Sequence, residues 1–152
     1  MSELRATESK ATRVEVRMPS RLGYEKVAMS TAASVAKLVG LAPERIDDLK
    51  TAVAEACINA IEHGNRMNEN LSVGVVLSAE SNLLEVKVLD DGKGIRTLPP
   101  APNIDRKMHG DEDPRGMGLF LMQALVDEAE WVPGTNGASS YVRLVIRLDK
   151  EA

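Results

Sequence analysis

The sequence lacks most of the features that tie a protein to an oxidising compartment, a membrane or nucleic acid. It holds one cysteine, Cys57, in 152 residues, so no disulfide can form within the chain, which fits a reducing cytoplasm. The formal net charge of -4 argues against the basic stripe that nonspecific nucleic-acid binding needs. No stretch has the apolar length of a signal peptide or of a membrane span. We therefore expect a cytoplasmic protein with no direct nucleic-acid partner and no membrane partner.

The chain does contain one continuous series of short apolar elements. Its 152 residues suit a single domain whose core needs no disulfides. Residues 1–13 mix charged residues with Ser, Thr and Ala, and we expect them to form a flexible tail. No internal repeat and no second hydrophobic core interrupts residues 14–150, which are therefore expected to form one domain.

Strands are predicted where apolar and polar residues alternate, because alternation buries one face of a strand. A short strand is also expected around the single tryptophan. The predicted strands are 14–18, 71–77, 84–88, 130–132 and 141–148. The second and third are joined by the turn Glu80-Ser81-Asn82, which predicts an antiparallel hairpin.

Helices are predicted where apolar residues recur with the helical period. The first is expected to end at Gly40, the second to begin at Pro43 and end near Gly64, and the third to open at a glycine-rich turn after Arg115. Met29 and Ala33 are expected on the outer side of the first helix. Its core stripe is predicted to be Tyr24, Val27, Ala28, Thr31, Ala32, Val35, Leu38 and Val39.

Three polar residues follow one line of the second helix. Glu55, Asn59 and His63 stand at four-residue intervals, while Cys57 lies on the packing side, which predicts an inert core thiol. A carboxylate one turn from a carboxamide suits the handling of a proton beside a hydrated divalent cation. An exposed polar stripe is the alternative, and the spacing alone leaves both interpretations open.

Two glycine-containing turns come after this helix. Asp90-Asp91-Gly92-Lys93-Gly94-Ile95 places an acceptor beside backbone that a ligand can approach closely, or it is simply a tight turn. Residues 96–115 contain four prolines and are expected to form a lid. The lid ends at Arg115-Gly116-Met117-Gly118-Leu119, where amides at a helix start would bind phosphate unless this too is only a turn.

The order of these motifs resembles the GHKL, or Bergerat-fold, ATP-binding superfamily. Within it, the chain is similar to the bacterial anti-sigma factor serine/threonine kinases, and the resemblance extends from Val14 to Leu148. Residues 46–60 and 118–128 are closest to the pattern of that subfamily. The resemblance implies an α+β fold, a two-layer sandwich in which helices cover one face of a mixed, mainly antiparallel sheet. It also implies a homodimer.

The same resemblance implies a role for each candidate site residue. Glu55 would be the general base toward a serine hydroxyl, Asn59 would coordinate Mg²⁺, and Asp90 would accept the adenine amino group of ATP. Ser140, or Ser139 as the alternative, would support that aspartate. The other implied nucleotide-binding positions are His63, Gly92, Gly94, Ile95, Arg115, Gly116, Met117, Gly118 and Leu119.

The implied function is that of an anti-sigma factor and protein serine kinase in a partner-switching pathway. It would bind a sigma factor and phosphorylate a serine of an anti-anti-sigma partner with a STAS domain. A nucleotide-dependent binding module without phosphotransfer is a second hypothesis. A histidine-kinase catalytic fragment is disfavoured, because His63 and His109 both lie within or beside the proposed nucleotide site. Met29 stands where the subfamily commonly has an arginine for partner contacts, so docking is expected to differ here.

Overall fold

One antiparallel sheet forms a layer of the molecule. The computed structural model describes residues 12–91, 114–134 and 139–148, with the backbone alone for residues 114–117. Within them the strand order is β1-β2-β3-β5-β4, and every pairing is antiparallel. The strands are β1 (Thr12–Pro19), β2 (Ser72–Glu80), β3 (Leu83–Asp90), β4 (Glu128–Val132) and β5 (Tyr141–Arg147).

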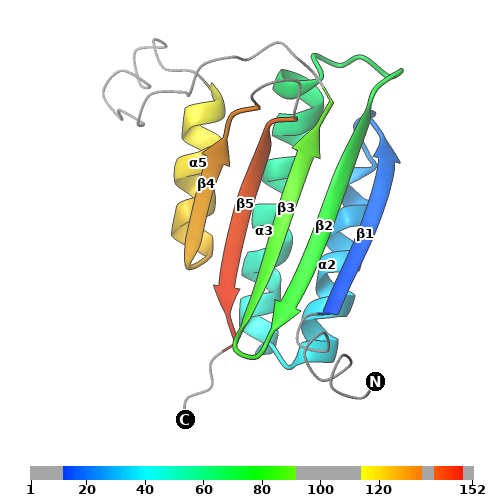
Figure 1. The fold of residues 1–152 in the computed structure, drawn as a ribbon. Coiled ribbons are helices and arrows are strands. Elements are labelled where there is room, and N and C mark those ends of the chain that lie inside the picture. Colours follow the sequence, from blue (N-terminus) through cyan, green and yellow to red (C-terminus); the bar gives the residue numbers. More distant parts are fainter. Residues whose placement is uncertain (1–11, 92–113, 135–138, 149–152) are drawn as a thin grey trace.

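Helices cover one face of this sheet (Figure 1). They are α2 (Glu25–Val39), α3 (Pro43–Asn59), which continues into a π-helical turn η1 (Ala60–Gly64), and α5 (Pro114–Leu125). The predicted α+β sandwich is therefore confirmed. None of the described helices is long and apolar enough to span a membrane.

Local signals fix the connection between α2 and α3. Gly40 adopts a left-handed conformation with φ of 95°, and its N–H donates to the carbonyl oxygens of Ala36 and Lys37. Pro43 occupies the first turn of α3, where its missing N–H costs no helical hydrogen bond. Both predictions are confirmed, and the short link makes α2 and α3 run in opposite directions (Figure 1).

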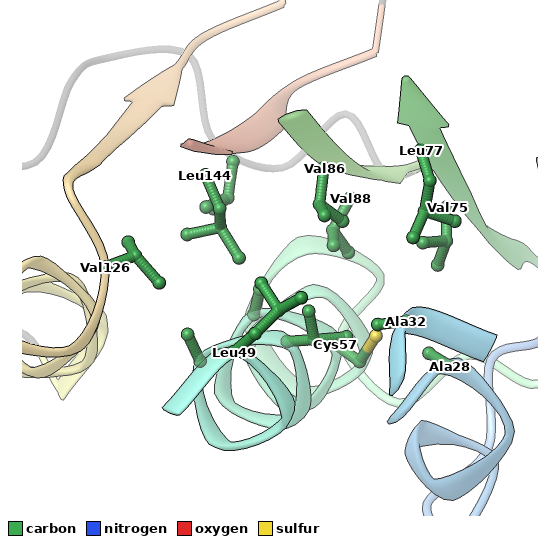
Figure 2. Close-up of a cluster of buried hydrophobic side chains, with 14 of the residues drawn as sticks. Ala28, Ala32, Leu49, Cys57, Val75, Leu77, Val86, Val88, Val126 and Leu144 are labelled. Atoms are coloured by element: carbon green, nitrogen blue, oxygen red, sulfur yellow. The ribbon is translucent and has the colours of Figure 1, made fainter. Parts of the chain in front are cut away.

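The core lies between the sheet and the helices. Figure 2 shows Val75 and Val86 pointing from the sheet toward Leu49 and Cys57 on α3, and all four side chains are fully buried. Burial, followed by the charge of Glu25, raises the pKa of the Cys57 thiol to about 12. The thiol therefore stays protonated at neutral pH, which confirms the predicted inert core cysteine.

The predicted core stripe of α2 is wrong at two positions. Val27 is 46% exposed and Leu38 is 85% exposed, whereas Ala36 is fully buried. The buried line of α2 includes Ala28 and Ala32, whose small side chains let the helix lie close to its neighbours. The helix is consequently rotated so that the larger Val27 and Leu38 stay at its outer side.

Two predicted segment boundaries also need correction. The sequence places Thr12 and Arg13 in the tail, but they pair with β2 as the first residues of β1. It places Pro114 and Arg115 in the lid, but they begin α5. Proline suits the first turn of a helix because its N–H would have no helical partner there.

Candidate functional site

Glu55 and Asn59 of α3 converge on a glycine of α5. A Cβ atom added to Gly118 would lie 2.6 Å from Asn59 Nδ2 and 2.8 Å from Glu55 Oε2. Because Gly118 has no side chain, the two polar groups approach the backbone of α5 directly. The structure thus brings a carboxylate and a carboxamide together at one point in the N-terminal half of α5.

The Asn59 amide is buried with an unfilled hydrogen-bonding capacity. Asn59 is 6% exposed, and its Nδ2 has no hydrogen-bond partner among the described residues. A buried donor left unpaired costs about 1–3 kcal/mol, so such groups are uncommon away from ligand sites. The amide oxygen is also a ligand type that Mg²⁺ accepts beside phosphate oxygens. These residues therefore fit a magnesium-bound phosphate.

A π-helical turn shapes the other end of the site. The sequence predicts one regular helix to Gly64, but the last turn widens, and the N–H of Asn65 donates to Ala60 O at 2.7 Å. The turn brings Gly64 against β3, where an added Cβ would collide with the carboxyl group of Asp90. Asp90 is buried. Its carboxyl group therefore stands against bare backbone, which only glycine allows.

A small pocket connects these two ends. It lies between α3, η1 and the ends of β3, β4 and β5, and it combines apolar walls with the polar groups of Asn59 and Asp90. Its volume is only about 10 Å³, so it marks where these polar and apolar groups converge and is far smaller than a nucleotide. The residues that line it are Ala56, Asn59, Ala60, Gly64, Val88, Asp90, Trp131, Tyr141 and Val142.

Of the two candidate serines, Ser140 is the one beside Asp90. The carbonyl oxygen of Ser140 accepts the backbone N–H of Asp90 at 3.2 Å, and its Oγ accepts the N–H of Gly134 at 3.1 Å. Ser139 instead lines a groove with residues of β1 and β2. Ser140, which directly precedes β5, thus holds the end of β3 through its carbonyl oxygen.

Two other predicted residues lie near the site without lining the pocket. His63 is half-buried, and its Nε2 lies 3.9 Å from Glu62 Oε1. Leu119 is partly buried and packs against the hydrophobic core. The spacing that makes His63 look equivalent to Glu55 and Asn59 is lost because η1 departs from the α-helical period.

The remaining predicted positions are less fully described. Arg115, Gly116 and Met117 belong to the start of α5, where the structure describes the backbone. Outside the described residues lie Gly92, Gly94, Ile95 and the greater part of the predicted lid.

Sequence patterns do not single out three residues that lie at the site. Trp131 and Tyr141 line the pocket, and Asn65 bonds to the residue that follows Asp90. Asn65 directly follows the predicted helix end at Gly64, and no motif in the sequence gives it a role. No local pattern could identify Trp131 and Tyr141, because their proximity to Asp90 depends on the order of β3, β5 and β4.

A larger groove lies near the link between α2 and α3, at the opposite end of the sheet from the end of β3 (Figure 1). Its arginines are paired with carboxylates. Arg45 Nη1 lies 2.9 Å from Asp48 Oδ2, and Arg147 Nη2 lies 3.9 Å from Glu128 Oε2. The side chains of both pairs are 34–62% exposed, so these contacts neutralise the two guanidinium groups only weakly.

The fold and the site define a nucleotide-binding domain of the ATPase type. Residues 18–146 match the family described as the histidine kinase-like ATPase domain, and the chain belongs to that family. The predicted GHKL relationship is thereby confirmed.

Its curated relatives include kinases of bacilli. The chain is 31% identical over 124 residues to the serine-protein kinase RsbW of Bacillus subtilis (strain 168), covering 76% of this chain and 74% of the relative. It is 32% identical over 128 residues to RsbW of Bacillus pumilus (strain SAFR-032), covering 77% and 76%.

A solved structure shares the fold. The structure of the RsbU and RsbW domains of Rv1364c from Mycobacterium tuberculosis superposes with a TM-score of 0.66 at 18% identity. The match covers 93% of this chain and 34% of that longer chain. At this identity the likeness supports the fold alone.

Proposed function

We propose that the protein is an ATP-dependent protein serine kinase that also sequesters a sigma factor. Its substrate would be a serine of a STAS-domain anti-anti-sigma protein. Membership of an ATPase-domain family and similarity to proteins named serine-protein kinases support this assignment. The observation that carries it is the convergence of Glu55 and Asn59 on the bare backbone of Gly118.

In this proposal ATP binds with its adenine beside the contact between Gly64 and Asp90 and its phosphates beside Gly118. Asp90 accepts the adenine amino group, and Gly64 leaves room for its carboxylate. Asn59 holds Mg²⁺ through its amide oxygen, and the amides at the start of α5 bind the phosphates. Bound Mg²⁺ supplies charge neutralisation on the phosphates.

Glu55 handles the proton of the acceptor serine. The serine oxygen attacks the γ-phosphorus, the bond to the leaving ADP breaks, and the hydroxyl proton passes to the Glu55 carboxylate. Phosphoryl transfer of this kind depends more on positioning than on a strong base. Asn59 and Glu55 lie one helical turn apart on α3, so a rigid element sets their relative positions.

The outer side of α2 is proposed as the partner-binding region. Met29 and Ala33, one helical turn apart on α2, are both half-buried. An apolar contact would thus replace the arginine contact common in the subfamily. The protein is further proposed to act as a homodimer in the cytoplasm.

The test is phosphotransfer from labelled ATP, with Mg²⁺, to the STAS-domain proteins of the same organism. Wild type should label a STAS serine, and Glu55→Gln should lower the rate by about 10²-fold or more while retaining ATP binding. Glu62→Gln is the matched control, since Glu62 is an exposed carboxylate seven residues further along the same helical segment. Nucleotide-sensitive binding of partners without any label would instead favour the binding module.

A further inference from the structure

Asn65 has a buried side chain whose amide is hydrogen-bonded at both ends. The residue is 2% exposed. Its Nδ2 donates to Ser20 Oγ and to the carbonyl oxygen of Ser72, both at 3.0 Å. Its Oδ1 accepts the backbone N–H of Asp91 at 2.8 Å. One amide therefore connects the end of η1 to the ends of three strands.

The connection to β3 is reinforced by a second contact. Asp91 Oδ2 accepts Ser72 Oγ at 2.8 Å and the Ser72 N–H at 3.3 Å. Asn65, Ser72 and Asp91 thus bond to one another in a closed set, which we call the Asn65 clasp. Ser20 joins the clasp from the side of β1, through its hydroxyl bond to the Asn65 amide.

The clasp lies one residue away from both walls of the proposed adenine pocket. Gly64 directly precedes Asn65, and Asp90 directly precedes Asp91. The Gly64 backbone and the Asp90 carboxyl group are in direct contact. Any shift between η1 and the end of β3 would therefore change the direction of the Asp90 carboxylate.

We propose that Asn65 is a positioning residue that sets the selectivity of the nucleotide site for adenine. This inference rests on the proposed function, in which Asp90 accepts the adenine amino group. A site that pairs with a polar group rejects analogues lacking that group, because the buried protein atom is then left unpaired. The penalty requires an acceptor that cannot turn elsewhere. Asn65 provides this by fixing the peptide that follows Asp90 against the turn that carries Gly64.

Selectivity is the property that separates this role from a purely structural one. A weakened fold lowers the affinity for all nucleotides alike. An Asp90 carboxylate that is no longer held in one direction lowers the affinity for ATP more than the affinity for an analogue without the amino group. The quantity to measure is thus the ratio of the dissociation constants of purine riboside triphosphate and ATP.

The experiment is calorimetric titration of the full-length protein with ATP and with purine riboside triphosphate, in the presence of Mg²⁺. Wild type is expected to prefer ATP, and Asn65→Ala to reduce the preference about tenfold, the effect of roughly one well-placed hydrogen bond. Ser20→Ala is the matched control. It removes one bond to the same amide on the side away from Asp91, so the preference should stay at the wild-type value.

An unchanged preference in folded Asn65→Ala would overturn the inference while leaving the kinase proposal standing. Wild type that binds neither nucleotide would overturn both. If Asn65→Ala does not fold, Ser72→Ala gives the second measurement, because it removes the hydroxyl bond to Asp91 Oδ2. The inference then expects a reduced preference, and an unchanged one contradicts it.

Discussion

Replacing Gly118 with alanine should strongly lower the rate of catalysis without unfolding the protein. The added Cβ would lie 2.6 Å from Asn59 Nδ2 and 2.8 Å from Glu55 Oε2, where ordinary contact begins at 3.4 Å. Both polar groups must therefore move by about 0.6–0.8 Å, and a displacement of roughly 1 Å can cost on the order of 10²-fold in rate. We expect a loss of that order in phosphotransfer.

The stability of the Gly118→Ala variant should change much less than its activity. Alanine favours a helix over glycine by about 1 kcal/mol. Forcing Glu55 or Asn59 about 30° off its preferred rotamer costs about 0.5–1.5 kcal/mol. The two effects largely offset each other, so urea unfolding should give a free energy within about 1 kcal/mol of wild type.

The assay is single-turnover phosphotransfer at saturating ATP, paired with urea unfolding of the same preparations. Gly74→Ala is the matched control, because an added Cβ there would meet only Leu89 Cδ1, at 3.9 Å. That variant should retain wild-type rates. Folded Gly118→Ala with wild-type phosphotransfer would refute the assignment of Glu55 and Asn59 to the reacting end of the nucleotide.

Three further variants or treatments test other parts of the structure. Gly64→Ala should weaken ATP binding about tenfold or more in calorimetric titration, since its Cβ would displace the Asp90 carboxyl group; unchanged affinity would contradict the placement of adenine. The raised pKa of Cys57, about 12, predicts that iodoacetamide at pH 9 alkylates unfolded but not native protein. Above pH 9 the unfolded chain loses the Cys57 proton, whereas the native protein keeps it until the pH nears 12. The free energy of unfolding is therefore unaffected by this thiol below pH 9 and falls as the pH rises from 9 toward 12. Met67 has a left-handed φ of 62°, so Met67→Gly should raise the free energy of unfolding by about 0.5–1 kcal/mol, whereas Met67→Ala, which keeps the strain, should not.

Much of the fold can be predicted from local patterns because each element repeats its buried face. The alternation in β2 and β3 and the helical period of α3 are visible over several residues, and the stop at Gly40 and the start at Pro43 use local chemistry. The predicted stripe of α2 is wrong at Val27 and Leu38 because both fit the helical period as well as the buried alanines do. Which stripe is buried depends on how closely the helix approaches its neighbours, and that is a tertiary property.

The candidate site likewise has one part that the sequence predicts and one part that depends on tertiary structure. Glu55 and Asn59 can be predicted together because they share one helix face. The contact between Gly64 and Asp90 cannot, since it depends on the π-helical turn and on the register of the sheet. The hydrogen bonds of Asn65 reach residues beside three different strands, so no spacing along the chain contains that information.

The central claim, that Asn59 and Gly118 mark the metal and phosphate end of an ATP site, can be tested by nuclear magnetic resonance. Mn²⁺ accepts the same oxygen ligands as Mg²⁺ and broadens nearby signals. Added to ¹⁵N-labelled protein with ATP, substoichiometric Mn²⁺ should first broaden the Asn59 side-chain amide and the Gly118 backbone amide, and only when ATP is present. Broadening centred instead on the groove around Arg45 and Arg147, or independent of ATP, would contradict the claim.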